Sequence, residues 1–464
     1  MRARWLVCLV LAVFFASLAA PAVAGNGDKI VRTKSSDGLP VINNVCQLLG
    51  CTVLLSLDTL PGQTQPSSLF LVRGLIDNVV TVLLSILGIY SIEPDLPIAV
   101  SQTPAPYISG QASASVVDEL WDRTPMSYYG TSAWEAYLTQ PAADIVRIRA
   151  THCGFNVTGG GVVAVIDTGI DVSHPTLQPL VTDGYDFVQD VGGGNEPFVA
   201  GQASASVVDG VYWVNPGTLA SVDQASASVV DDTSHYAFGH GTMVAGVVHL
   251  VAPTAKIMPL RAFSADGQGY TSSILRAIYY ATRKGSKVLN MSFSRPTSSP
   301  ELKRALDNAV SNGLIPVSSA GNNGSASLVY PAALDNTMGV GSTANDDTRS
   351  SFSNYGPQDV FVVAPGEGII TTYPGGRFAG AWGTSFSAPF VSGAAALLVG
   401  MKSSVSNSQA SSAISHAKRL TSDLGYGRLD LYQTVLAGRA LWYSITVSPV
   451  PDTCVAGGLD WSAP

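Results

Sequence analysis

The chain of 464 residues has few charged side chains and no excess of basic ones. Asp, Glu, Lys and Arg make up only 12% of the residues, and the net charge is −8 at pH 7. A protein that gathers phosphate groups needs a basic surface, so the composition argues against nucleic acid as a partner. The 46 glycines and 46% apolar residues are typical of a compact, loop-rich globular protein.

Long apolar runs are also scarce. The first, at residues 5–18, follows two arginines and precedes Ala22-Val23-Ala24, which is the pattern of a signal peptide over residues 1–24. Later runs, such as residues 79–90, are too short for a membrane span. We therefore expect a secreted, extracellular chain, with the periplasm as the alternative, and no transmembrane segment after the signal is removed.

Cysteine is limited to five residues, of which Cys8 lies in the expected signal peptide. The remaining four suggest two disulfides, because an even count in an exported chain is typical of paired cysteines. A Cys46–Cys51 bond would close a local loop, and a Cys153–Cys454 bond would reach the C-terminal tail. Buried free thiols are the alternative.

Residues 25–102 are predicted to form a small α+β domain, with short apolar strands and a helix at 76–87. A Pro-, Gly- and Ser-rich linker and the start of the next region follow at 103–140. The octapeptide Gln-Ala-Ser-Ala-Ser-Val-Val-Asp occurs three times, too few and too unevenly spaced for a solenoid; the copies lie at 111–118, 202–209 and 224–231. The sequence assigns no role to these repeats.

Residues 141–442 alternate between apolar strands and amphipathic helices, and a tail of residues 443–464 follows. This alternation predicts an α/β domain with a doubly wound, mainly parallel sheet and helices on both faces. The first helix is expected at 142–150. Strands are expected at 161–166, 256–259, 287–291, 314–318, 338–342 and 360–364, with helices at 243–250, 272–282, 301–311 and after residue 385. Active sites of such sheets lie at the C-terminal ends of the strands.

Three residues in three separate settings supply a nucleophile, a base and an orienting carboxylate. Asp167 directly follows an apolar strand, and its alternative role is to cap the next turn. His240 stands between glycines at the start of a helix of small residues. Ser385 lies at the start of a buried helix, where backbone N–H groups favour a developing negative charge. Together they predict nucleophilic catalysis.

Asn322 follows the strand at 314–318 on a turn bounded by glycines. Its amide could donate a hydrogen bond to a tetrahedral oxyanion, with the backbone N–H of Ser385 as the second donor. An ordinary Asn-Gly turn at Asn323-Gly324 is the alternative.

Other hydrolytic mechanisms lack their required residues. An aspartic protease needs two paired carboxylates, and the chain has no second Asp-Thr-Gly or Asp-Ser-Gly motif. A zinc protease would show His-Glu-x-x-His, which is absent. An α/β-hydrolase needs glycine where Ser387 stands, and a different order of the three catalytic residues. We therefore expect catalysis that requires no cofactor.

The chain resembles the subtilisin-like serine peptidases (subtilases) over roughly residues 141–437. Four motifs in the family's order carry the resemblance: Val165-Ile166-Asp167-Thr168-Gly169-Ile170-Asp171 with His174-Pro175; His240-Gly241-Thr242 with Val244-Ala245-Gly246; Ala320-Gly321-Asn322; and Gly383-Thr384-Ser385 with Ser387-Ala388-Pro389.

The resemblance implies a secreted serine endopeptidase that acts on polypeptides. It implies that Ser385 attacks the scissile carbonyl, His240 transfers the proton, Asp167 orients His240 and Asn322 stabilises the oxyanion. It also implies two edge segments that bind the substrate, with the residues Ser292, Phe293, Ser294, Ser319, Ala320 and Gly321.

The resemblance further implies a self-processed zymogen. The unit that ends at Ile92-Glu93-Pro94-Asp95 is similar to the family's propeptide, which acts as an intramolecular inhibitor, and we expect a monomer. Thr176 stands where many members have an aspartate ligand for calcium, so a structural calcium site is left open. A catalytically silent binding or surface protein is the alternative, and the four intact motifs argue against it.

The windows that resemble the primary specificity pocket are residues 290–296 and 318–333. Neither contains Asp or Glu, and Val329 is expected to narrow the pocket floor. A buried Lys or Arg of the substrate would therefore lack a charge partner. The sequence predicts a broad preference for apolar or modest-sized residues before the scissile bond.

Overall fold

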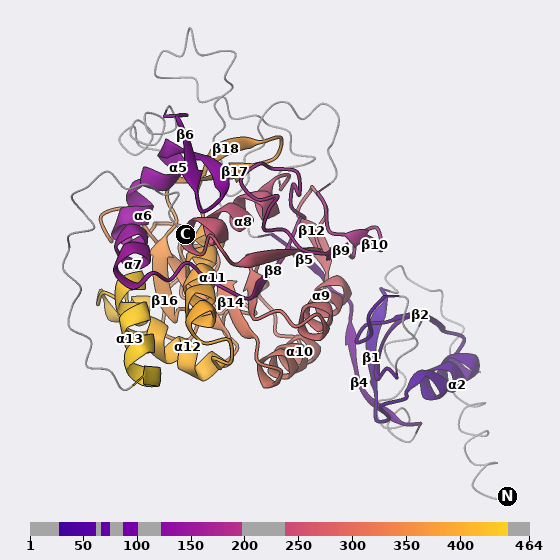
Figure 1. Cartoon of the computed structure of the whole chain (residues 1–464). Coiled ribbons are helices and arrows are strands. Elements are labelled where there is room, and N and C mark those ends of the chain that lie inside the picture. Colours follow the sequence, from indigo (N-terminus) through magenta and orange to yellow (C-terminus); the bar gives the residue numbers. More distant parts are fainter. Residues whose placement is uncertain (1–26, 62–65, 75–86, 101–121, 197–236, 444–464) are drawn as a thin grey trace, which may run out of the picture. The chain divides into compact units, whose positions relative to one another are not determined.

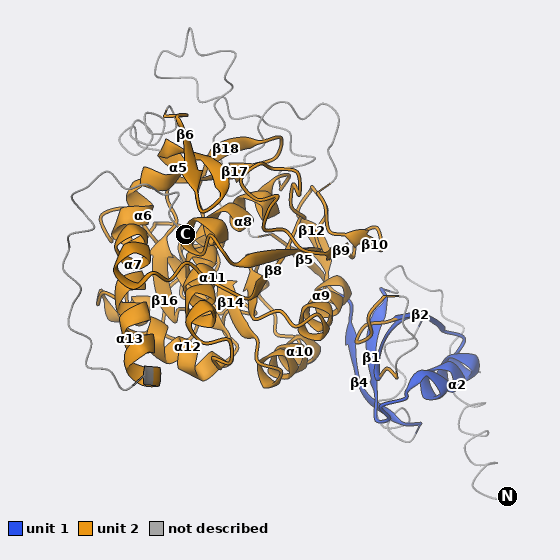
Figure 2. Ribbon diagram, in the orientation of Figure 1, with its two compact units in different colours: residues 1–55, 68–95 blue, residues 56–67, 96–464 orange. Residues whose placement is uncertain are grey.

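The computed structural model describes residues 27–61, 66–74, 87–100, 122–196 and 237–443 (Figure 1). By its internal contacts the chain divides into two compact units, one of residues 1–55 and 68–95 and the other of residues 56–67 and 96–464 (Figure 2). The predicted signal peptide, nearly all of the helix at 76–87, all three octapeptides and residues 444–464 lie outside the described residues.

The first unit is the predicted small α+β domain. Its four-stranded sheet has the order β2-β3-β1-β4, and β1 pairs antiparallel with both β3 and β4. The helix α2 (Leu39–Leu49) buries Ile42, Val45 and Cys46 against apolar residues of the sheet. The strands are β1 (Lys29–Thr33), β2 (Thr52–Ser56), β3 (Leu69–Arg73) and β4 (Ile89–Pro94).

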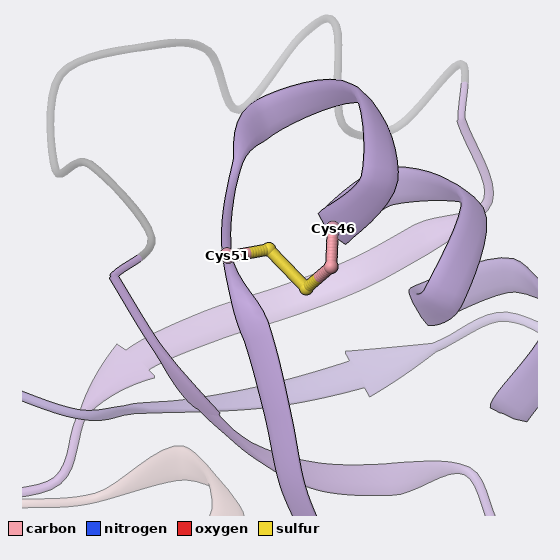
Figure 3. The surroundings of a disulfide bond; sticks show 2 residues. All are labelled: Cys46 and Cys51. Carbon is pink, nitrogen blue, oxygen red and sulfur yellow. A yellow bond between two sulfur atoms is a disulfide. The ribbon is translucent and has the colours of Figure 1, made fainter.

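A disulfide closes the turn after α2. Cys46 and Cys51 are bonded with an S–S distance of 2.10 Å and a Cα–Cα distance of 4.4 Å, which confirms this predicted pair (Figure 3). Cys153 is also disulfide-bonded. Because Cys454 lies outside the described residues, the Cys153–Cys454 pair stays a prediction.

The second unit is built on an eight-stranded sheet in the order β10-β9-β11-β8-β13-β14-β15-β16. All neighbouring strands in it are parallel except the edge strand β10, which confirms the predicted mainly parallel sheet. The strands are β8 (Val162–Asp167), β9 (Gly184–Asp186), β10 (Val191–Gly193), β11 (Lys256–Arg261), β13 (Val288–Met291), β14 (Ile315–Ser319), β15 (Met338–Thr343) and β16 (Val362–Pro365).

Helices cover both faces of this sheet. The crossover from β8 to β11 runs one way along the sheet, and the crossovers from β11 to β13 and from β13 to β14 run the other way. Right-handed crossovers in opposite directions place their helices on opposite faces. Thus α8 (His240–Val251), which packs on α11 (Thr384–Met401), lies on one face, and α9 (Thr271–Arg283) packs on α10 (Pro300–Ser311) on the other.

The helix α11 lies among the other elements of the second unit (Figure 1), and nearly all of its residues are buried. Its 18 residues are long and apolar enough to cross a membrane, which corrects the expectation that no later segment is long enough. However, 89% of the helix is buried inside the protein, where it contacts α8 and the strands β13 to β16. It is therefore a core helix.

The predicted helix at 142–150 is two helices in the structure, α6 (Pro141–Ile145) and α7 (Ile148–Phe155). Arg147 adopts a left-handed conformation with φ of 66°, which ends α6 and starts α7 in a new direction.

Smaller elements that the sequence did not predict complete the unit: β6 (Pro125–Tyr128), β7 (Thr131–Trp134), α5 (Glu135–Thr139), β17 (Ile369–Tyr373), β18 (Arg377–Ala381), α12 (Asn407–Ile414), the 3₁₀ turn Ser422–Leu424 and α13 (Leu431–Tyr443).

Candidate active site

The candidate site lies where the strand order reverses. The three strands that follow β8 along the chain, β9, β10 and β11, lie on one side of it, and β13 lies on the other. Ligands of open α/β sheets bind at such a switch point, outside the C-terminal ends of the strands. Asp167 ends β8, Ser292 directly follows β13, and Asn322 follows β14, so three predicted site residues meet at this edge.

Asp167 is buried at the end of β8. Its Oδ1 accepts hydrogen bonds from the backbone N–H of Thr168 at 2.8 Å and from Nδ1 of His240 at 2.7 Å. The chain turns sharply at Gly169, whose φ is 107° and where a Cβ would stand 2.9 Å from the backbone of Glu196. A larger residue at this position would displace the turn that aims the carboxylate.

His240 is the first residue of α8, and Gly241 lets that helix approach the turn after β8. A Cβ on Gly241 would stand 2.1 Å from the carbonyl oxygen of Gly169. The N–H of Gly241 instead donates to Oγ1 of Thr168 at 3.1 Å. The Asp-Thr-Gly and His-Gly-Thr motifs therefore fit together directly, which explains the small residues in both.

Ser385 is the second residue of α11, where the backbone N–H groups of the first turn have no partner within the helix. Its Oγ donates to the carbonyl oxygen of Ser292 at 3.2 Å, and Oγ of Ser292 donates to the carbonyl oxygen of Ser385 at 2.8 Å. The ring of Phe386 lies 5.4 Å from that of His240, centroid to centroid. The start of α11 is thus held next to the start of α8.

Beneath Ser385 lies a buried polar chain that sequence reasoning missed. Nδ2 of Asn290 donates to Oγ of Ser292 at 2.9 Å, and Oγ of Ser392 donates to Oδ1 of Asn290 at 2.7 Å. This chain links β13 to α11 at the position of Ser385. Asn290 and Ser392 are 102 residues apart, and the only signal in the sequence was a polar side chain inside each apolar element.

The amide of Asn322 has a defined orientation. Its Oδ1 accepts two hydrogen bonds from Thr384, one from the backbone N–H at 2.9 Å and one from Oγ1 at 2.7 Å. The side-chain NH₂ group is therefore turned away from Thr384. That Asn322 and the N–H of Ser385 together hold a developing oxyanion stays a prediction from the sequence.

The two predicted substrate-binding segments lie side by side after β13 and β14. Oγ of Ser319 donates to the carbonyl oxygen of Phe293 at 3.5 Å, and Ala320 and Gly321 continue toward Asn322. A further strand, β5 (Pro97–Ala99), already occupies part of this region. It pairs antiparallel with β12 (Gln268–Tyr270), and Ala99 forms a bridge with Ser294.

Val329 borders the segment Ser319 to Gly321. A Cβ built on Gly321 would lie 3.3 Å from Cγ2 of Val329, so the valine side chain packs against this glycine. The adjacent Tyr330 exchanges two backbone hydrogen bonds with Arg295, at 2.8 and 2.9 Å. The structure therefore places Val329 against the predicted substrate-binding segment, and its role as the floor of the specificity pocket stays a prediction.

Four of the remaining five histidines are described, and they have other partners. Buried His249 contacts Tyr137 and Thr131, and burial lowers its pKa to about 3. His152 and His174 contact backbone carbonyls, and burial also lowers the pKa of each, to about 4 for His152. His416 is exposed and contacts the carbonyl of Ser412, while His235 lies outside the described residues.

Thr176 is buried, and its Oγ1 donates to the carbonyl oxygen of Ser132 at 2.7 Å. At the position where many family members have a calcium-binding carboxylate, this chain therefore has a neutral hydroxyl that is already hydrogen-bonded. Among the described residues, no group of three or more His, Cys, Asp or Glu is arranged to hold a metal ion.

Comparison with known proteins agrees with this geometry. The profile of the subtilase family (Peptidase S8) matches residues 158–433. Subtilisin BL of Lederbergia lenta is 35% identical over 290 residues, which cover 60% of this chain and 90% of that protein. An alkaline protease of Shouchella clausii is 33% identical over 332 residues, 69% of this chain and 75% of that protein.

A solved structure shares the fold. The crystal structure of a lanthipeptide protease superimposes with a TM-score of 0.52 over 73% of this chain and 99% of that chain, at 22% sequence identity. The family profile and the curated relatives cover the sheet and the helices that carry the four motifs. The chain belongs to the subtilase family and is a serine-type endopeptidase.

Proposed function

We propose that this subtilase hydrolyses peptide bonds through Asp167, His240 and Ser385 and is made as a secreted, self-processed zymogen. The observation that carries the assignment of the catalytic residues is the hydrogen bond of 2.7 Å between Nδ1 of His240 and Oδ1 of Asp167, with both side chains buried. Because Asp167 accepts the Nδ1 proton, Nε2 of His240 keeps its lone pair and acts as the base.

In the first step, His240 takes the proton from Oγ of Ser385 as that oxygen bonds to the scissile carbonyl carbon. The carbonyl oxygen becomes an oxyanion, which accepts hydrogen bonds from the Asn322 amide and the Ser385 N–H. The protonated His240 then gives its proton to the leaving amine, and an acyl-enzyme on Ser385 remains. Water releases the acyl group by the same sequence of proton transfers.

A fluorophosphonate probe tests this assignment. We expect the mature protein to be labelled once, on Ser385, since the probe reacts only with a serine that a working base activates. A peptide map locates the label. A folded, mature protein that takes no label would support the alternative of a catalytically silent binding protein.

The position of β5 supports the zymogen proposal. Leu96 accepts hydrogen bonds on its carbonyl oxygen from the N–H and Oγ1 of Thr271, at 3.1 and 3.0 Å, and the N–H of Val100 donates to Gly267 at 2.9 Å. In the uncut chain the side chains of Ser385 and His240 have 0% exposed surface. A chain segment that pairs like a substrate with the edge of the site is expected to block other peptides until it is cut and released.

We predict that self-processing cuts the bond between Ser101 and Gln102. Ala99 is bridged to Ser294 in antiparallel register, so extending the register by two residues would bring residue 101 opposite Ser292. The carbonyl of Ser292 is the acceptor for Oγ of Ser385. N-terminal sequencing of the mature enzyme should therefore begin at Gln102, and a first cut elsewhere in the chain would show that the register does not continue.

We predict that Val329 limits the residue accepted before the scissile bond. On a peptide library the wild type should prefer Ala, Val or Leu over Lys and Arg, because the pocket windows offer no carboxylate. Val329→Gly should raise kcat/KM for aromatic residues by about tenfold or more relative to alanine, as apolar pockets discriminate by about 1–3 kcal/mol per group. Dominant cleavage of the wild type after Arg would contradict this view.

We further propose that catalysis requires no metal or other cofactor and that the enzyme acts as a secreted monomer. The proposed side chains and backbone groups supply each proton transfer and each oxyanion contact. The signal-peptide pattern of residues 1–24 supports export. A chelator should leave the initial rate of hydrolysis unchanged. A rapid loss of activity that zinc restores would contradict the mechanism. A slow loss of activity on heating that calcium restores would reveal a structural calcium site.

A further inference from the structure

A second buried carboxylate lies beside the Asp167–His240 pair, and the mechanism above does not use it. Glu196 is only 6% exposed. Its Oε1 accepts a hydrogen bond from the backbone N–H of Gly239 at 2.8 Å, and its Oε2 accepts one from Oγ1 of Thr242 at 3.3 Å. Glu196 therefore binds the residues that begin α8 on both sides of His240.

The backbone of Glu196 contacts the other half of the pair. Its N–H donates to the carbonyl oxygen of Ile170 at 3.1 Å, in the turn that follows Asp167. Gly169 lies so close that a Cβ there would stand 2.9 Å from both Cα and N of Glu196. One residue thus packs on the turn that carries Asp167 and also holds the helix that carries His240.

Thr242 reinforces this link. Its Oγ1 accepts a hydrogen bond from the N–H of Asp171 at 2.9 Å, so its hydroxyl proton is directed to Glu196. The connection therefore runs from the turn after β8, through Thr242 and Glu196, to Gly239. Each of these hydrogen bonds is buried or partly buried, where a lost partner is costly.

We propose that Glu196 is a positioning residue for the Asp167–His240 pair. By holding Gly239 and Thr242 against the turn after β8, its carboxyl group keeps Nδ1 of His240 aligned with Oδ1 of Asp167. Glu196 acts through these residues and does not touch the substrate. The inference rests on the proposed function, because it assumes that the pair serves Ser385.

The groups that face Glu196 set its charge. Burial is the main cause that raises its pKa, to about 8, and the charge of Asp167 on β8 acts in the same direction. Hydrogen bonds from Gly239 and Thr168 lower the pKa, as does the charge of Arg261 on β11. His240 on α8 adds a positive charge only when it is protonated. Glu196 is therefore neutral near pH 7 and gains its charge in the alkaline range.

This titration gives two readouts, in kcat and in stability, and a merely structural residue would lack the one in kcat. A negative charge beside Asp167 stabilises the imidazolium that forms in the transition state, so kcat of the wild type should rise as the pH increases through about 8. Since folding raises the pKa of Glu196 from 4.5 to about 8, its contribution to stability is full below about pH 4.5 and is lost as the pH rises through about 8.

The experiment compares processed wild type, Glu196→Gln and Glu196→Ala, with active sites counted by the fluorophosphonate label. We expect Glu196→Ala to lower kcat per labelled site by up to about 10²-fold with little change in KM, as small misplacements of catalytic groups do. Glu196→Gln keeps the acceptor for Gly239 and should stay within about tenfold of wild type at pH 7. It should lack the alkaline rise in kcat and unfold at higher temperature than wild type at pH 9.

Glu301→Gln is the matched control, because Glu301 is also buried but pairs with Arg304 in α10, on the other face of the sheet. It should leave the pH profile unchanged. If Glu196→Gln has the wild-type kcat per labelled site and the wild-type alkaline rise, the positioning role is wrong, even if Glu196→Ala does not fold. A wild type that takes no label would instead overturn the proposed function.

Discussion

Ser385→Ala should abolish peptide hydrolysis and leave the chain in one uncut piece. The serine hydroxyl forms the covalent bond to substrate, and alanine offers no nucleophile in its place. The expected loss in kcat is on the order of 10⁶-fold, since removing the nucleophile disables the whole set of catalytic residues. Hydrolysis of a short peptide and electrophoresis of the purified chain measure the two effects.

Ser387→Ala provides the control for this variant. Ser387 lies two residues later on α11, is equally buried, and donates through Oγ to the carbonyl oxygen of Pro365 at 3.2 Å. Its loss should leave hydrolysis and processing in place. If Ser385→Ala alone were processed at the wild-type rate, self-processing would be wrong. If that variant also kept wild-type hydrolysis, the nucleophile would have to be another residue.

The same variant separates cleavage by the chain itself from cleavage by another molecule. Uncut Ser385→Ala protein mixed with mature wild type should be cut at the bond after Ser101, whereas alone it should stay whole. The variant should stay folded, because it loses only the hydrogen bond of 3.2 Å to Ser292 and no large side chain. Thermal unfolding checks this. Cutting of the variant in the mixture would show that the segment is a substrate. If the variant stays uncut when incubated without wild type, its own cleavage requires Ser385.

The parallel sheet was predictable from local patterns. In β8, Val162 to Ile166 form a continuous apolar run because both faces of the strand are covered, and such a run stands out in a sequence. The break between α6 and α7 was not predictable, because it depends on the left-handed conformation of Arg147, a residue type that rarely adopts it. The hairpin of β17 and β18 lacked a clear alternating pattern, since nearly all of its residues are buried.

The residues of the site also divide into those that the sequence could predict and those that it could not. Asp167, His240, Ser385 and Asn322 lie in short motifs whose glycines and small residues mark the close approach of the backbone. The residues that hold them are joined over long separations, 62 residues for Thr384 and Asn322 and 43 for Glu196 and Gly239. Such contacts depend on the tertiary fold, and no local pattern in one sequence reveals them.

Asp167→Asn should lower kcat by roughly 10⁴-fold while the protein stays folded. Oδ1 of Asp167 accepts from both Nδ1 of His240 and the N–H of Thr168, and Oδ2 is buried without a hydrogen-bond partner among the described residues. If the asparagine oxygen replaces Oδ1, the NH₂ group is buried where no acceptor meets it. If the amide is reversed, its NH₂ group faces two N–H donors and favours the wrong tautomer of His240.

In either orientation the variant loses the charge that stabilises the imidazolium, so kcat should fall much more than KM changes. Glu196→Gln makes the same chemical change, from a carboxyl to an amide, on the adjoining carboxylate. It should lower kcat near pH 7 by less than about tenfold, because Glu196 is already neutral there and only positions the pair. If the two variants lose kcat to a similar extent at pH 7, both carboxylates are charged and share one role. If Asp167→Asn loses far more, orientation of His240 belongs to Asp167 alone.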